Sequence, residues 1–170
     1  ITVAVMMNAK DVVQGGDSAR TISAAFVEKK KSRVDMIRFA AIHSEVDALA
    51  PAVATLHTLG YRVAINLMQV SDRSPEEIRA FGKQCKTMGV EVAYIADSFG
   101  GLRPHELAPI MHALAEGFEG PVGCHLHDNM TYALSSTLAA VDAGATWVDA
   151  TILGMGRGPG NVRTEYLAPE

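Results

Sequence analysis

The chain has 170 residues, of which 48% are hydrophobic and 20% are charged. This composition excludes a disordered chain and is sufficient for one sizeable core. The formal net charge of −4 argues against a nucleic-acid surface, which is normally basic. No apolar run reaches the roughly 18 residues that a membrane span needs, so we expect neither a nucleic-acid nor a membrane partner. Only two cysteines are present and no signal peptide is visible, which predicts a reduced, cytoplasmic setting.

Short apolar runs rich in β-branched residues alternate with helix-length segments along the chain. The predicted strands are residues 1–7, 34–41, 61–70, 90–96, 121–127 and 145–153. The predicted helices are residues 18–30, 45–59, 75–88, 104–117 and 132–143. This alternation indicates about six strand–helix units and a parallel sheet covered by helices. Because no linker or shift in composition interrupts the pattern, we expect a single domain over residues 1–170.

Polar residues occur at or just beyond the carboxyl ends of several predicted strands. They are Asn8, Asn66, Asp97, His125, His127 and the loop that follows Leu153. The alternation alone is compatible with an open doubly wound sheet and with a (β/α)8 barrel. Polar side chains at the ends of several different strands fit the catalytic face of a barrel better than a single crevice. The predicted fold class is therefore α/β, a (β/α)8 barrel.

Two histidines occur in the run Gly-Cys-His-Leu-His-Asp, residues 123–128. Because residues two apart in a strand share a face, His125 and His127 point the same way and Cys124 points to the opposite side. Two neighbouring imidazoles form a good pair of metal ligands, although hydrogen-bonded pocket histidines without metal are an equally open reading. Asp128 is a candidate to orient one of the two rings as a carboxylate behind the metal ligands.

A glycine-rich loop, Gly-Met-Gly-Arg-Gly-Pro-Gly-Asn, follows the last predicted strand at residues 154–161. It lacks the Gly-Lys-Ser/Thr of a phosphate-binding P-loop, and Pro159 replaces the third glycine of the dinucleotide fingerprint. Gly156 and Gly158 allow the backbone to approach a ligand closely. Arg157 offers a fork for a carboxylate or phosphate, and Asn161 offers a carbonyl oxygen to a metal. A tight structural loop is the alternative.

Asp97 follows an apolar strand, and Arg38 lies within another. Asp97 can bind a ligand or take part in acid–base chemistry, and capping of a turn is equally plausible. A buried arginine needs a partner, so we expect Arg38 to pair in the interior with a carboxylate such as Asp97. The alternative is that Arg38 points outward and stacks.

Four segments together carry a resemblance to a known superfamily: GCHLHDN, YIADSFGG, VDMIRFAAIH, and VDAGATWVDATILGMGRGPGN followed by TE. They resemble the pyruvate-utilising, metal-dependent lyases and synthases (HMGL-like), and the aldolase branch most. The resemblance implies a barrel that binds divalent Mg, Mn or Zn. It implies metal ligands at His125, His127 and Asn161 and catalytic positions at Arg38 and Asp97. From the strand ends and the glycine-rich loop, we also expect substrate contacts at Asn66, Gly156, Arg157 and Gly158.

One motif of this superfamily has no match in the chain. Its first strand carries an Asp-x-Thr-Leu-Arg-Asp-Gly type sequence, which supplies a carboxylate metal ligand and an arginine. Residues 1–7 instead resemble the third strand, so we expect a partial barrel without the first two strand–helix units.

The resemblance implies a metal-dependent C–C bond lyase of the aldolase type, acting on a 4-hydroxy-2-oxo acid through a metal-stabilised enolate. One alternative is a synthase of the same superfamily that joins an acyl-CoA to a 2-oxo acid. Another is a non-catalytic domain derived from a barrel that binds metal or a partner. The expected small-molecule partner is a 2-oxo acid, and a homo-oligomer or a partner dehydrogenase is possible.

Overall fold

Six parallel strands form one sheet in the computed structural model, which describes residues 1–170. The strands are β1 (Ala4–Asn8), β2 (Met36–Ala41), β3 (Arg62–Leu67), β4 (Val92–Asp97), β5 (Val122–Leu126) and β6 (Trp147–Val148). They lie in chain order, and each strand pairs in parallel with the next one. This arrangement confirms the six strand–helix units that the sequence alternation predicts.

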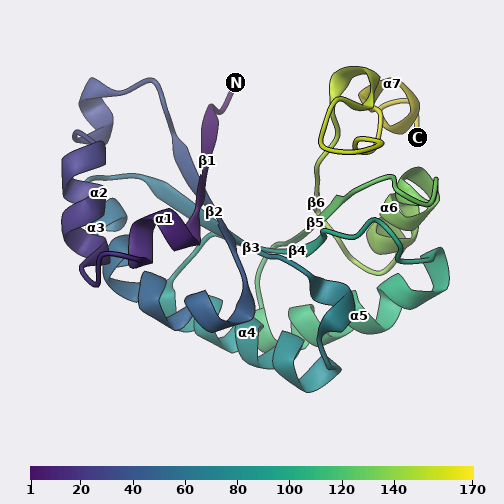
Figure 1. Ribbon diagram of the computed structural model, residues 1–170, viewed down its shortest axis with the longest axis horizontal. Coiled ribbons are helices and arrows are strands. Elements are labelled where there is room, and N and C mark those ends of the chain that lie inside the picture. Colours follow the sequence, from purple (N-terminus) through teal and green to yellow (C-terminus); the bar gives the residue numbers. More distant parts are fainter.

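The helices cover the convex side of this sheet, except α7 (Thr164–Leu167), which lies beside Ile152–Gly154 near the opening (Figure 1). They are α1 (Ala9–Val13), α2 (Ser18–Ala25), α3 (Ala50–Thr58), α4 (Pro75–Met88), α5 (Pro104–Phe118), α6 (Ala133–Asp142) and α7 (Thr164–Leu167). The sheet is curved into an open bowl, with β1 and the β6–α7 segment on opposite sides of its opening (Figure 1). The fold is therefore that of a (β/α)8 barrel represented by six of its units, with β1 and β6 unpaired to each other.

The bounds of α4 match the predicted helix because its end signals are strong. The Ser74 hydroxyl accepts from the Glu77 amide at 3.2 Å, and the Glu77 carboxylate accepts from the Ser74 amide at 2.8 Å. This reciprocal capping satisfies two amides that the first turn would leave unpaired. Gly89 ends the helix with φ at 71°, a left-handed conformation that glycine adopts at little cost.

Other predicted bounds are wrong where short turns replace regular structure. The strand expected over residues 145–153 has only two residues, because the chain leaves the sheet and enters a 3-10 turn at Ile152–Gly154. The helix expected over residues 18–30 ends at Ala25, and the one expected from residue 45 begins at Ala50 after two 3-10 turns. The short helix α1 directly follows β1, with no intervening loop, and was not predicted.

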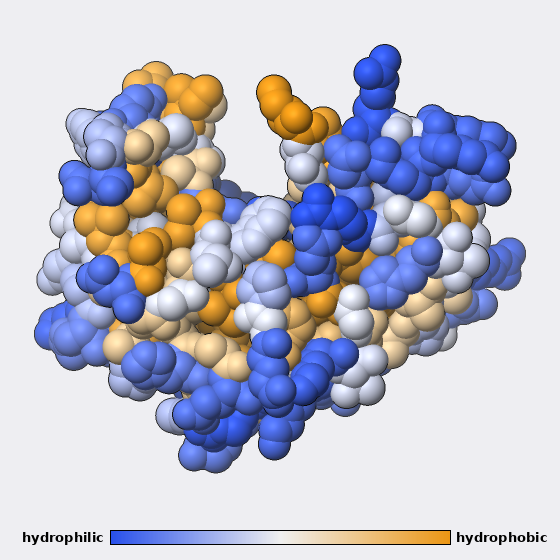
Figure 2. Space-filling model, turned by 180° about the vertical axis from the view of Figure 1, so that it is seen from behind, coloured by the Kyte–Doolittle hydropathy of each residue, from blue (hydrophilic) through white to orange (hydrophobic).

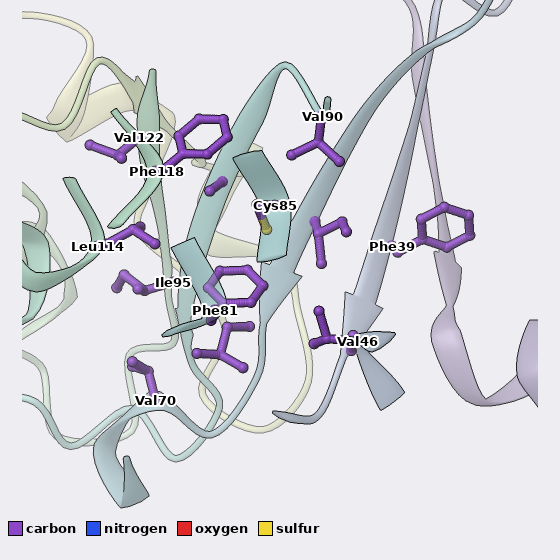
Figure 3. Packing of buried hydrophobic residues seen from close by; sticks show 14 of the residues in the cluster. Phe39, Val46, Val70, Phe81, Cys85, Val90, Ile95, Leu114, Phe118 and Val122 are labelled. Carbon is purple, nitrogen blue, oxygen red and sulfur yellow. The ribbon is translucent and has the colours of Figure 1, made fainter. Parts of the chain in front are cut away.

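Strand alternation divides the side chains into two layers. Ile95 and its equivalents on the other strands point outward into a cluster of 35 buried residues shared with the helices. Figure 3 shows part of this cluster, where Phe81 and Cys85 of α4 pack beside Ile95. Inward-facing Tyr94 belongs to a second, smaller cluster of four buried residues inside the bowl, against which Trp147 packs. The inner layer forms the floor on which the polar residues of the strand ends rest.

The interior of the bowl leaves apolar side chains uncovered near its opening. Met6, on the inward face of β1, is 49% exposed, and Leu153 beyond β6 is 72% exposed. The space-filling view shows a hollow between two flanks, with apolar surface along it (Figure 2). None of the helices combines the length and apolar character that crossing a membrane requires.

Candidate metal and substrate site

A cavity of about 290 Å³ opens at the carboxyl ends of the strands. Its polar lining residues come from β1, β3, β5, the residues directly after β4 and β5, and the glycine-rich loop. They are Asn8, Asn66, Ser98, His125, His127, Arg157 and Asn161. The structure thus brings together most of the polar residues that the sequence places at strand ends. The apolar part of the wall includes Met6 and Met68.

The two histidines lie side by side in this cavity. His125 is on β5 and His127 directly follows its end, and the ring centroids are 5.2 Å apart with the rings at 80° to each other. Cys124 between them is 1% exposed and packs into the outer core, so it faces away as predicted. Burial lowers the pKa of His127, and the neighbouring His125 adds to this shift. A lowered pKa favours the neutral imidazole, which is the form that binds metals.

Asn161 lines the same cavity and carries an unpaired side-chain oxygen. Its Nδ2 donates to the carbonyl of Met155 at 3.0 Å, and its Oδ1 is buried without a hydrogen-bond partner. The loop can wrap around this amide because residue 156 is glycine: a Cβ there would collide with the Asn161 side chain. A buried amide oxygen without a partner is costly unless something binds it. Two imidazoles and this oxygen fit a divalent cation such as Mg²⁺, Mn²⁺ or Zn²⁺.

No cluster of three or more His, Cys, Asp or Glu side chains suitable for a metal occurs in the chain. The donor set therefore consists of two imidazoles and one amide, and it includes no carboxylate. This finding agrees with the absence of the superfamily's first-strand motif from the sequence.

Arg157 lies where two cavities meet. It lines the cavity described above and a neighbouring one of about 320 Å³, which Gly158 also lines. Arg157 is exposed and forms no ion pair within the chain. Its positive charge opposes protonation of His127, which shares both cavities. A free guanidinium beside neutral imidazoles can bind a carboxylate through paired hydrogen bonds.

Arg38 pairs with a carboxylate in the interior, as expected, but its partner is Asp149 and not Asp97. Arg38 forms two hydrogen bonds with Asp149, of 2.9 and 2.6 Å, and stacks 4.2 Å above the ring of Tyr94. It does not line the cavity but lies on the inward face of β2. Asp149 directly follows β6 and points into the bowl, where it can reach Arg38. The carboxylate of Asp97 instead accepts hydrogen bonds from backbone amides.

Asp97 and Asp128 both hold the backbone of local turns. The Asp97 carboxylate is 2% exposed and accepts from the amides of Gly100 at 3.0 Å and Leu102 at 2.8 Å. Asp97 therefore caps a turn, which was the alternative considered above, and it does not line the cavity. The prediction that Asp128 orients a histidine is wrong, because its side chain accepts from the amide of Ala133 and starts α6.

Asp149 is the carboxylate that sequence reasoning missed. Its Oδ2 lies 2.9 Å from Nδ1 of His125. Burial acts to raise the pKa of Asp149, but hydrogen bonds with His125 and Arg38 outweigh it and hold the pKa below its usual value. The available signal was an aspartate at the end of an apolar strand, five residues before the glycine-rich loop.

Comparisons with known proteins agree with this geometry. The family model described as HMGL-like matches residues 4–169. A 4-hydroxy-2-oxovalerate aldolase from Brevibacillus brevis is 35% identical over 134 residues, which are 79% of this chain and 39% of that protein. An oxaloacetate decarboxylase from Mycobacterium tuberculosis is 34% identical over 134 residues, again 79% of this chain and 40% of that protein.

A solved structure supports the same fold. The N-terminal domain of a Bacteroides vulgatus protein assigned as an aldolase superposes with a TM-score of 0.80 at 29% identity. The match covers 99% of this chain and 54% of the other. The chain spans about two-fifths of the length of the curated relatives it matches. With the family model matched along nearly the whole sequence, the chain belongs to the HMGL-like family.

Proposed function

We propose that this chain forms the metal-binding part of a metal-dependent C–C bond lyase that cleaves a 4-hydroxy-2-oxo acid. The observation that carries the proposal is the meeting of His125, His127 and the unpaired Asn161 oxygen in one cavity. A 2-oxo acid has two adjacent oxygen functions that a divalent cation can hold together. The name of the aldolase relative supports a substrate of this class.

Each cavity residue has a distinct part in this proposal. His125, His127 and Asn161 hold the cation, which when bound supplies Lewis-acid polarisation of the 2-oxo group. Arg157 binds a carboxylate of the substrate through its guanidinium fork. In the cleavage, a general base takes the proton of the 4-hydroxyl group, the bond between C3 and C4 breaks, and C4 leaves as an aldehyde. The electron pair stays on C3 as the enolate of pyruvate, which then takes up a proton.

Decarboxylation of oxaloacetate is a second candidate, favoured by the named oxaloacetate decarboxylase relative. This reaction also breaks the bond between C3 and C4 of a 2-oxo acid and leaves the electron pair on C3. The leaving group is carbon dioxide in place of an aldehyde, so no hydroxyl proton has to be removed. The same cavity chemistry serves both reactions, and only the cleavage of the hydroxy acid also needs a base that removes the 4-hydroxyl proton.

The test uses the protein as its gene encodes it, stripped of metal with EDTA and reloaded with Mn²⁺. Pyruvate release from 4-hydroxy-2-oxopentanoate and from oxaloacetate is followed with lactate dehydrogenase and NADH. Thiol release from an acyl-CoA in the presence of a 2-oxo acid tests for a synthase. We expect metal-dependent pyruvate release from the hydroxy acid. Metal binding with no turnover of any substrate would favour a non-catalytic domain.

Variants of the two histidines provide the structural control. His125→Ala and His127→Ala should each abolish tight Mn²⁺ binding and pyruvate release, because each removes one imidazole from the cavity. His112→Ala is the matched variant, since His112 is exposed on α5 away from the cavity. Unchanged metal content in both site variants, measured by elemental analysis, would contradict the assignment.

A further inference from the structure

A buried ion pair lies beneath the cavity and contacts two of its side chains. Arg38 on β2 and Asp149 after β6 are joined by hydrogen bonds of 2.9 and 2.6 Å, and their side chains are only 15% and 18% exposed. Tyr94 supports the pair from below, with its ring centroid 4.2 Å from the guanidinium carbon. Neither member lines the cavity, so the pair acts on a ligand only through the residues that it holds.

His125 is one of the residues held by this pair. Its Nδ1 lies 2.9 Å from Oδ2 of Asp149. The ionised carboxylate can only accept a hydrogen bond, so Nδ1 must carry the proton. The other ring nitrogen, Nε2, is then left with a lone pair, which is what a metal ligand requires.

Asn66 on β3 is the second residue held by this pair. Its Oδ1 lies 3.3 Å from Nη2 of Arg38. A guanidinium has only donors, so this contact fixes the amide with its oxygen toward Arg38 and its NH₂ group away from it. Asn66 is 2% exposed and lines the cavity, and its NH₂ group makes no hydrogen bond within the chain.

We propose that the Arg38–Asp149 pair sets the hydrogen-bonding direction of two cavity residues in opposite senses. It makes His125 present a lone pair to a cation, and it makes Asn66 present an N–H donor to an anionic oxygen of the substrate. Arg38 and Asp149 are thus positioning residues, in place of the catalytic role that the sequence suggested for Arg38. The hydrogen-bonding directions of His125 and Asn66 do not depend on the proposed function, whereas the contact of Asn66 with substrate rests on it.

The first test reads the tautomer of His125 directly and needs neither metal nor substrate. Long-range proton–nitrogen NMR of the ¹⁵N-histidine-labelled, metal-free protein separates protonated from unprotonated ring nitrogens. Spectra are recorded well above the ordinary histidine pKa of about 6.5. The signal that disappears in His125→Gln identifies the residue. We expect a protonated Nδ1, and a proton on Nε2 in the unmodified protein would overturn the proposal.

The second test removes the pair while avoiding an unpaired buried charge. Arg38→Met combined with Asp149→Leu replaces both charges with apolar groups of similar volume, which is tolerated better than removing one partner. We expect that the NMR signal of a protonated Nδ1 on His125 is lost and that the Mn²⁺ affinity is weaker by roughly 10- to 100-fold. An unchanged signal would overturn the proposal. Should this variant fail to fold, the tautomer of the unmodified protein still decides.

A matched control is available at the opposite end of the same strands. Arg62 begins β3 and is paired with Glu91 just before β4, outside every cavity described above. Arg62→Met combined with Glu91→Leu makes the same chemical change away from His125. This variant should keep the His125 signal and the Mn²⁺ affinity. If it alters them as strongly as the first double variant does, the effect is a general loss of folding and the proposal fails.

The third test addresses the Asn66 donor, with oxalate as the probe. Oxalate resembles a planar 2-oxo acid and undergoes no cleavage, so its binding does not depend on the reaction. Asn66→Leu should weaken oxalate binding to the Mn²⁺-loaded protein by roughly 10-fold, the value of one hydrogen bond to a charged acceptor, with Mn²⁺ affinity unchanged. Equal oxalate affinity, or no oxalate binding to the unmodified protein, would overturn this half of the proposal.

These outcomes are separable from failure of the proposed lyase activity. A protein with the protonated Nδ1, normal Mn²⁺ binding and no pyruvate release would refute the activity and retain the positioning role. A protein that releases pyruvate but has its proton on Nε2 would refute the positioning role alone.

Discussion

Gly123 lies directly against the aromatic floor of the bowl, so adding one methyl group there should destabilise the protein. A Cβ at this position would be 2.5 Å from Cε1 of Tyr94 and 2.8 Å from two further ring atoms. The ring has little room to move, because Tyr94 is 1% exposed and Arg38 lies over it. We therefore expect Gly123→Ala to force the ring from its position.

The size of this effect follows from two opposing contributions. Overpacking a dense interior costs about 1–3 kcal/mol. Replacing a strand glycine by alanine stabilises the folded state by about 0.5–1 kcal/mol, because alanine loses less backbone entropy on folding. The net loss in the free energy of unfolding should be about 1–2 kcal/mol. With a urea dependence of about 1–3 kcal/mol per molar, the unfolding midpoint should fall by roughly 1 M.

Urea unfolding followed by fluorescence measures this change. Trp147 is the only tryptophan in the chain and packs against the cluster that contains Tyr94, so its emission reports on the floor. Gly101→Ala is the matched control, because a Cβ there meets nothing within 4 Å. Its midpoint should barely change.

A double variant tests whether the Tyr94 ring is the cause. In a Tyr94→Leu background, Gly123→Ala should cost almost nothing, which corresponds to a coupling energy of at least about 1 kcal/mol. Gly123→Ala with an unchanged midpoint, or with an equal cost in both backgrounds, would refute this packing argument.

Three further results are expected. Asn161→Leu should weaken Mn²⁺ binding, measured by calorimetry, by at least roughly 10-fold, because loss of a residue that only hydrogen-bonds a metal ligand already costs about that much. An unchanged affinity would show that this amide does not bind the metal. Arg157→Gln should raise KM for the 2-oxo acid about 10-fold at unchanged Mn²⁺ affinity, and a change in kcat alone would contradict carboxylate binding. Hydrogen bonds from Arg62 hold the pKa of Glu91 below 4.5, so its stabilising contribution is complete above that pH and is lost as the pH falls through the folded-state pKa. Glu91→Gln should therefore lose less stability than the unmodified protein as the pH falls below about 4.5 in urea titrations, and identical acid sensitivity would argue against this.

Helix α4 and the shared orientation of the two histidines could be predicted because their signals are local. Helix α4 carries its capping residues within its own sequence, and the two-residue spacing of His125 and His127 fixes their common face. The glycine-rich loop likewise predicts where Asn161 approaches the strand ends. Each of these inferences needs only a few neighbouring residues and one structural period.

The partners of the charged residues could not be predicted in the same way. Arg38 and Asp149 are 111 positions apart, and no local pattern states which of several strand-end carboxylates meets a given arginine. Asp97 was a reasonable partner for Arg38 and Asp128 for a histidine, but both carboxylates accept hydrogen bonds from nearby amides. Asp97 and Asp128 cap local turns, whereas Asp149 points into the interior and pairs with Arg38.

The nearest-neighbour order of the strands has a consequence for how the protein folds. Every strand pairs with the next one along the chain, so each step of sheet formation closes only a short loop. The pair between Arg38 and Asp149 is different, because it joins the second strand to the sixth and must wait for the strands between them. We expect the cavity to be assembled last during refolding, so that Mn²⁺ binding would follow the development of the sheet in time.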